Sequence, residues 1–98
     1  MLGKFVLTLL LLVSSLAAQA ANPYPPDVRN FIAKREDCEH FLGEIPEPEQ
    51  KHRMREVMRE IKVLCTGTDR RLAKLKKKYA NNPPVLKRLA EFDTRIEG

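Results

Sequence analysis

The 98-residue sequence contains no tryptophan, only four glycines and only two cysteines, and aromatic residues make up 6% of it. No serine occurs after residue 20, which excludes a serine nucleophile from that part of the chain. The patterns C-x-x-C, H-x-x-x-H and H-E-x-x-H are absent, and with them the common zinc-site spacings. No long apolar run follows the first 13 residues, although a membrane-spanning helix needs about 20 apolar residues.

The first 20 residues have the pattern of a secretory signal peptide. Lys4 supplies a positive charge, residues 5–13 (FVLTLLLLV) are apolar, and Ala18 and Ala20 give an A-x-A cleavage pattern. We expect cleavage before Ala21, and therefore a periplasmic or secreted protein with no transmembrane segment after cleavage. The alternative is an uncleaved anchor, for which the apolar run is short.

Residues 21–26 (ANPYPP) form a proline-rich leader, and we expect 27–98 to fold as one helical domain. Apolar residues recur at three- and four-residue steps in four runs, 27–43, 48–65, 69–80 and 83–96. The first run has one charged interruption on its apolar side, Arg35. No alternation typical of strands occurs. The predicted class is all-α, a small bundle of three to four short helices with one disulfide.

Several residues at the ends of these runs favour helix starts and stops. Asp27, Thr68 and Asn82 are predicted as N-caps, because their side chains accept hydrogen bonds from free backbone N–H groups. Gly43 and Gly67 follow helical runs and are expected to end them.

Cys38 and Cys65 both fall on the apolar sides of their helices. In an oxidising compartment, two thiols in one small domain predict a disulfide. Closing the intervening loop stabilises the fold by roughly 3 kcal/mol, which matters because so small a core is marginal. In a tight hairpin the two cysteines would not be level. We therefore expect the segment EIPEPE (44–49) to act as a stiff extended spacer.

An alternative interpretation is a metal- or thiol-dependent protein that uses Cys38, His40 and Glu36. Glu36 and His40 are four residues apart and share one side of a helix, whereas Cys38 and His40 do not face each other. A thiol enzyme also needs a free thiolate beside a base. We therefore expect no metal, no cofactor and no enzymatic activity.

The charge is divided along the chain. Residues 21–50 carry three basic and seven acidic side chains, whereas 51–88 carry thirteen basic and three acidic ones. The basic face of the second and third runs comprises Lys51, Arg55, Arg59, Lys62, Arg70, Arg71, Lys74, Lys76, Lys77 and Lys78. Export and the absence of interleaved aromatics argue against nucleic acid as the partner. The basic face is either a solvated surface or a contact for an acidic protein or envelope component.

Met54 and Met58 lie with Val57 and Ile61 on the apolar side of the second run. At this spacing such residues usually belong to the core. The alternative is a flexible apolar face that binds a partner or forms a homodimer.

The pattern CEHFLGE…CTGTDxxLAxLKKKY resembles one in small exported bacterial proteins without an assigned activity. The residues that carry the resemblance are Cys38, His40, Phe41, Gly43, Glu44, Cys65, Gly67, Thr68, Asp69, Leu72, Leu75, Lys76 and Tyr79. It implies a periplasmic or secreted location and supplies no catalytic residues. With the residues themselves, it favours a non-catalytic protein that acts by protein or envelope interaction.

Overall fold

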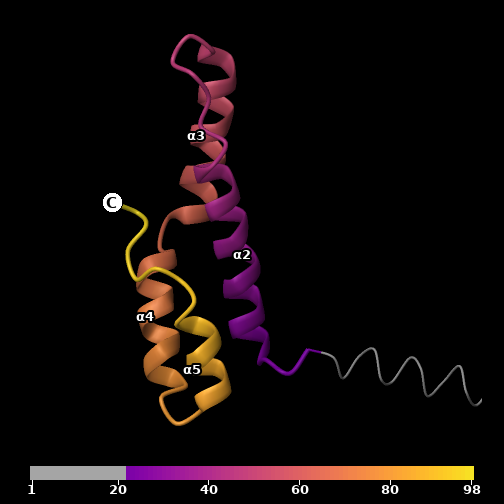
Figure 1. The fold of residues 1–98 in the computed structure, drawn as a ribbon, viewed down its shortest axis with the longest axis vertical. Coiled ribbons are helices and arrows are strands. Elements are labelled where there is room, and N and C mark those ends of the chain that lie inside the picture. The colour runs from indigo at the N-terminus through magenta and orange to yellow at the C-terminus, as the bar shows by residue number, and fades with distance from the viewer. Residues whose placement is uncertain (1–21) are drawn as a thin grey trace, which may run out of the picture.

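The structure is a computed structural model that describes residues 22–98; the predicted signal peptide and Ala21 lie outside the described residues. Its helices are α2 (Pro26–Leu42), α3 (Lys51–Cys65), α4 (Thr68–Lys78) and α5 (Pro83–Leu89) (Figure 1). Between residues 22 and 98 the chain forms no strand. The prediction of a small all-α fold is confirmed.

Helices α2 and α3 form an antiparallel hairpin, and the far part of this hairpin projects beyond the rest of the molecule (Figure 1). Helix α4 follows α3 after a short turn, and α4 and α5 lie alongside the N-terminal half of α2. At one end of the molecule α2, α4 and α5 pack together, and we call this the packed end. At the other end only α2 and α3 lie against each other.

The hydrophobic core lies at the packed end, between α2, α4, α5 and the segment after α5. Phe31 and Phe92 meet edge to face within it, with ring centroids 5.5 Å apart. The core consists of Val28, Phe31, Leu72, Leu75, Val85, Leu89 and Phe92, with Tyr24, Ile32 and Tyr79 packed against it.

Two of the predicted N-caps are wrong. Helix α2 begins at Pro26 with Pro25 in the cap position, so Asp27 lies in the first turn and its carboxylate is used elsewhere. Helix α4 is preceded by Gly67 in the left-handed region, and Thr68 is its first residue and is buried. Glycine adopts this backbone conformation without steric cost, which allows the chain to turn sharply between α3 and α4.

Two helix boundaries also differ from the prediction. Helix α3 begins at Lys51 rather than at residue 48, because the N–H of Gln50 bonds to the carbonyl of Glu47 in a separate turn. Helix α5 ends at Leu89, where the N–H of Phe92 bonds three residues back and turns its ring into the core. The predicted cap at Asn82 is confirmed, since its side chain accepts from the N–H of Val85.

Cys38 and Cys65 form the predicted disulfide, with their Cα atoms 5.0 Å apart. Cys65 ends the 15-residue helix α3, which is about 22 Å long, whereas only four residues of α2 follow Cys38. The segment 43–50 runs on past the end of α2 before α3 returns, which makes the cysteines level (Figure 1).

Candidate functional site

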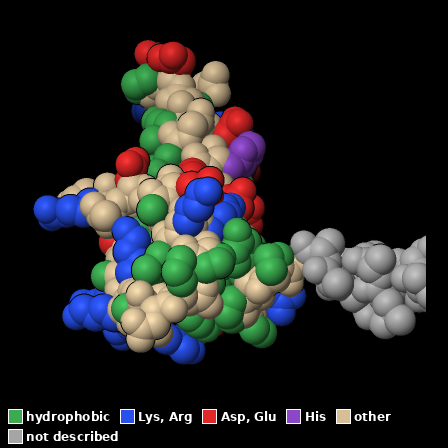
Figure 2. Space-filling model, turned by 60° about the horizontal axis from the view of Figure 1, so that its bottom comes forward, with side chains coloured by type: hydrophobic (Ala, Val, Ile, Leu, Met, Phe, Trp, Pro, Cys, Tyr) green, Lys and Arg blue, Asp and Glu red, His purple; other side chains and the backbone are tan. Residues whose placement is uncertain are grey.

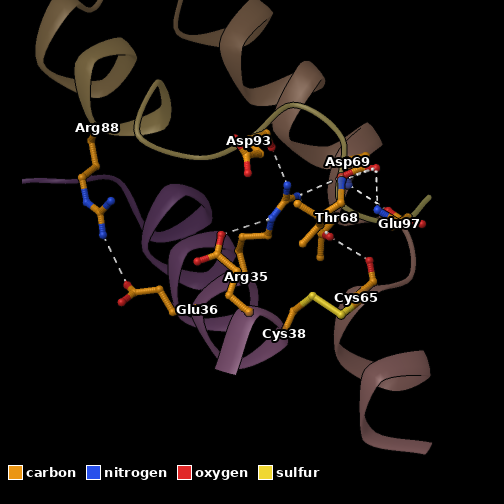
Figure 3. Close-up of polar contacts among 11 residues, drawn as sticks. Arg35, Glu36, Cys38, Cys65, Thr68, Asp69, Arg88, Asp93 and Glu97 are labelled. Carbon is orange, nitrogen blue, oxygen red and sulfur yellow. Dashed lines mark hydrogen bonds and ion pairs between the residues drawn. A yellow bond between two sulfur atoms is a disulfide. The ribbon is translucent and has the colours of Figure 1, made fainter. Parts of the chain in front are cut away.

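Arg35 is completely buried where α2, α4 and the C-terminal segment meet (Figure 3). Its Nη1 donates to Thr68 Oγ1 at 3.2 Å and lies 3.2 Å from Asp69 Oδ1. Its Nη2 donates to the backbone carbonyl of Asp93. Its Nε has no hydrogen-bond partner and lies 3.8 Å from Glu39 Oε1. Arg35, the charged residue on the apolar side of the first run, therefore links α2 to α4 and to the C-terminal segment. We call this set of contacts the Arg35 junction.

The disulfide and the Arg35 junction are joined through Thr68. The hydroxyl of Thr68 donates to the carbonyl of Cys65 at 2.7 Å and accepts from Arg35. Cys38 is fully buried and Cys65 is only 5% exposed. Such burial protects a bridge from attacking thiols and is typical of a structural disulfide.

Asp69 connects the Arg35 junction to the end of the chain (Figure 3). Its carboxylate accepts from the N–H groups of Ile96 and Glu97, and its own N–H donates to Glu97 Oε1. Burial opposes ionisation of Asp69, but these N–H donors and the Arg35 guanidinium outweigh it and lower its pKa. The negatively charged Asp69 side chain thus holds the C-terminal segment against the start of α4.

A second polar group holds the other end of the packed region together. The carboxylate of Asp27 accepts from Lys78 Nζ at 2.6 Å and from the Tyr79 hydroxyl at 2.7 Å. These bonds, led by the one from Lys78, lower the pKa of Asp27 to about 2. The same carboxylate raises the pKa of Lys78 and of Tyr79. The group ties the start of α2 to the end of α4.

The residues of the metal- or thiol-dependent alternative have other partners. Cys38 is bonded to Cys65, Glu36 pairs with Arg88 at 3.3 Å, and His40 projects into solvent. In the part of the chain that the structure describes, no three His, Cys, Asp or Glu side chains gather as metal ligands. Since neither described cysteine is free, the geometry offers this alternative no thiol.

The structure divides the predicted basic face between two helices. On α3, Lys51, Arg55, Arg59 and Lys62 are all exposed. On α4, the exposed members are Arg70, Lys74, Lys77 and Lys78, whereas Arg71 and Lys76 are half-buried. Within residues 22–98, Lys78 is the one member of the basic face that forms an ion pair. Figure 2 shows basic side chains at several places around the packed end.

One feature of the sequence indicates the Arg35 junction, although apolar periodicity does not reveal it. A lone arginine on an apolar side needs a buried partner, and Thr68 and Asp69 supply hydroxyl and carboxylate oxygens at the start of α4. Their nearness to Arg35 depends on the hairpin and the Gly67 turn together. Sequence spacing alone does not contain that information.

None of the helices between residues 22 and 98 is long and apolar enough to cross a membrane. No protein-family model, curated protein or solved structure matches the chain. The resemblance to small exported bacterial proteins therefore stays a prediction.

Proposed function

We propose that this is a non-catalytic periplasmic or secreted protein that binds an acidic protein or envelope component through the outer face of α4. The outer face of α4 is defined by Arg70, Lys74 and Lys77. These residues recur at four- and three-residue steps, so their side chains share one side of the helix. All three are exposed, and none forms an ion pair with another residue of 22–98.

The opposite side of α4 supports this proposal because it holds the helix in place. Leu72 and Leu75 are buried in the core, and Asp27 holds the far end through Lys78 and Tyr79. The three cations are therefore presented from a fixed backbone, which lowers the entropic cost of binding. Unpaired, exposed cations on a rigid helix are the observation that carries the proposal.

The test is a charge reversal of the outer face, Arg70→Glu, Lys74→Glu and Lys77→Glu together. Lys78 stays unchanged, because its loss would also break the contact with Asp27. The immobilised wild-type protein should retain a specific component of envelope extracts, and raising the salt to about 1 M should release it. The reversed variant should not retain it.

A matched control carries the same change in net charge elsewhere. Arg29, Lys87 and Arg95 are exposed residues outside α4, and all three are replaced by glutamate. This control should retain the component at wild-type level. Equal loss in both variants would show that only net charge matters, and retention by the reversed variant would exclude the outer face of α4 as the contact.

A further inference from the structure

The projecting part of the hairpin has an apolar side that its own chain leaves uncovered. Met58 is 47% exposed, and Met54 and Ile61 are half-buried, although all three lie on the apolar side of α3. The expectation that this set belongs to the core is therefore wrong for Met58, and only Val57 and Cys65 of α3 are buried. The physical reason is that α4 and α5 cover only the packed end of the molecule.

These residues form a continuous stripe. Met54, Met58 and Ile61 recur at four- and three-residue steps along α3. Leu42, from the last turn of α2, is also half-buried and lines the same hollow as Ile61, beside Ile96 and Glu97 of the C-terminal segment. We call Leu42, Met54, Met58 and Ile61 the apolar stripe. Figure 2 shows hydrophobic side chains along one side of the projecting hairpin.

The two edges of the hairpin carry opposite charges. The α3 edge holds Lys51, Arg55, Arg59 and Lys62, none of which forms an ion pair with another residue of the described chain. The other edge, made of the end of α2 and the following turn, contains no lysine or arginine from residue 36 to 50. Beyond the disulfide it carries the exposed carboxylates Glu39, Glu44, Glu47 and Glu49.

We propose that two copies of the protein associate through the apolar stripe, with their hairpins parallel, to form a four-helix bundle. A two-fold axis that runs along the hairpin places the basic edge of each copy opposite the acidic edge of the other. An axis across the hairpin would instead bring like edges together. The charge pattern therefore favours a second copy of the protein as the partner of the apolar stripe, and it favours the parallel arrangement of the two hairpins.

The apolar stripe and the edges have distinct roles in this association. Methionine side chains adapt to an opposing apolar surface, so burial of the stripe supplies the affinity. The edges set the alignment, because a slipped or reversed arrangement leaves like charges in contact. The outer face of α4 is not involved, so this inference does not rest on the proposed function.

The first test is the mass of the purified, disulfide-bonded protein in solution, measured by light scattering over micromolar to submillimolar concentrations. The wild type should pass from the mass of one copy to that of two. Met58→Asp should remain a single copy over this range. Val63→Asp is the matched control, because Val63 is 63% exposed on the same helix but lies off the stripe, and it should dimerise like the wild type.

The second test is a pair of charge reversals. Arg55→Glu, Arg59→Glu and Lys62→Glu together leave the α3 edge with three acidic side chains and one basic side chain, so both edges are then acidic. Glu44→Lys, Glu47→Lys and Glu49→Lys together leave the other edge with three basic side chains and one acidic side chain, so both edges are then basic. Each variant alone should be monomeric, whereas an equimolar mixture should form a mixed dimer, because opposite edges then face each other at both sides. A wild type that stays monomeric throughout, or a mixture that does not associate, would overturn the proposal. The reversed α4 variant should dimerise normally, so this result and that of the proposed function can be told apart.

Discussion

The guanidinium of Arg35 lies 3.2 Å from the carboxylate of Asp69 and joins α2 to α4 inside the fold. Asp69 is also the residue that binds the C-terminal segment, so three parts of the chain depend on one pair. Buried pairs of this kind contribute little compared with an apolar replacement of both partners. Removal of one partner is costly, because it leaves the other charge uncompensated.

Asp69→Ala should therefore lower the free energy of unfolding by about 3 kcal/mol, because the fully buried Arg35 would lose its nearest carboxylate. Arg35→Met should cost less, about 1–2 kcal/mol, since it removes one donor from neutral acceptors and leaves a partly exposed carboxylate that still accepts from the N–H groups of Ile96 and Glu97. Urea denaturation of both variants shows which substitution lowers the free energy of unfolding more. A smaller cost for Asp69→Ala than for Arg35→Met would contradict this account of the junction.

Loss of the disulfide should have the same effect whichever cysteine is removed. Cys38→Ser and Cys65→Ser should each lower the free energy of unfolding by about 2–4 kcal/mol, because the unfolded chain loses a loop constraint. The double variant should be little worse than either single one, since both remove the same bond. Additive effects in urea denaturation would mean that the two sulfurs are not partners.

The Asp27 group predicts a loss of stability in acid. The hydrogen bond from Lys78, followed by the bond from Tyr79, lowers the pKa of Asp27 from 3.8 to about 2. A carboxylate with a lowered folded-state pKa stabilises the protein fully above its unfolded pKa. Its contribution disappears as the pH falls from about 4 to about 2.

Asp27→Asn removes the titrating carboxylate, so comparison with the wild type isolates the pH-dependent contribution of Asp27 to stability. The free energy of unfolding of wild type and variant, measured at steps between pH 5 and pH 2, should converge as the pH falls. A gap that stays constant across this range would exclude the Asp27 carboxylate as its source.

Two glycines provide a matched test of backbone conformation. Gly67 has a φ of 84°, and a Cβ there would meet no other atom, so the cost of Gly67→Ala comes from the backbone alone. We expect that cost to be about 1 kcal/mol. Gly43 has a φ of −81° in the helical region, so Gly43→Ala should be neutral or slightly stabilising. Thermal unfolding of both variants tests the contrast, and equal melting temperatures would contradict it.

Apolar periodicity was sufficient to predict the helices and the cysteine pair. Each helix buries one side, so residues such as Leu72 and Leu75 recur at the helical period regardless of what they pack against. The disulfide followed from two cysteines on two apolar sides. The end of α5 was not predictable in this way, because Phe92 and Ile96 continue the period after the chain has left the helix.

The junction and the stripe depend on how the helices are placed relative to each other. Arg35 interrupts a pattern in the sequence, but the Gly67 turn brings Thr68 and Asp69 to it in the fold. Met58 continues a pattern in the sequence, but no helix of the described chain covers it. A period states which side of a helix is apolar, and the tertiary arrangement determines whether that side is covered.

The position of the disulfide has a consequence for proteolysis. The bridge joins α2 to α3 at the base of the projecting hairpin, so the exposed turn between Gly43 and Gln50 lies inside the covalent loop. A protease that cuts this turn opens the peptide chain without releasing either piece. The nicked protein keeps its mass on a non-reducing gel and separates into two fragments only after reduction, so the hairpin tip is cleavable while the molecule remains whole.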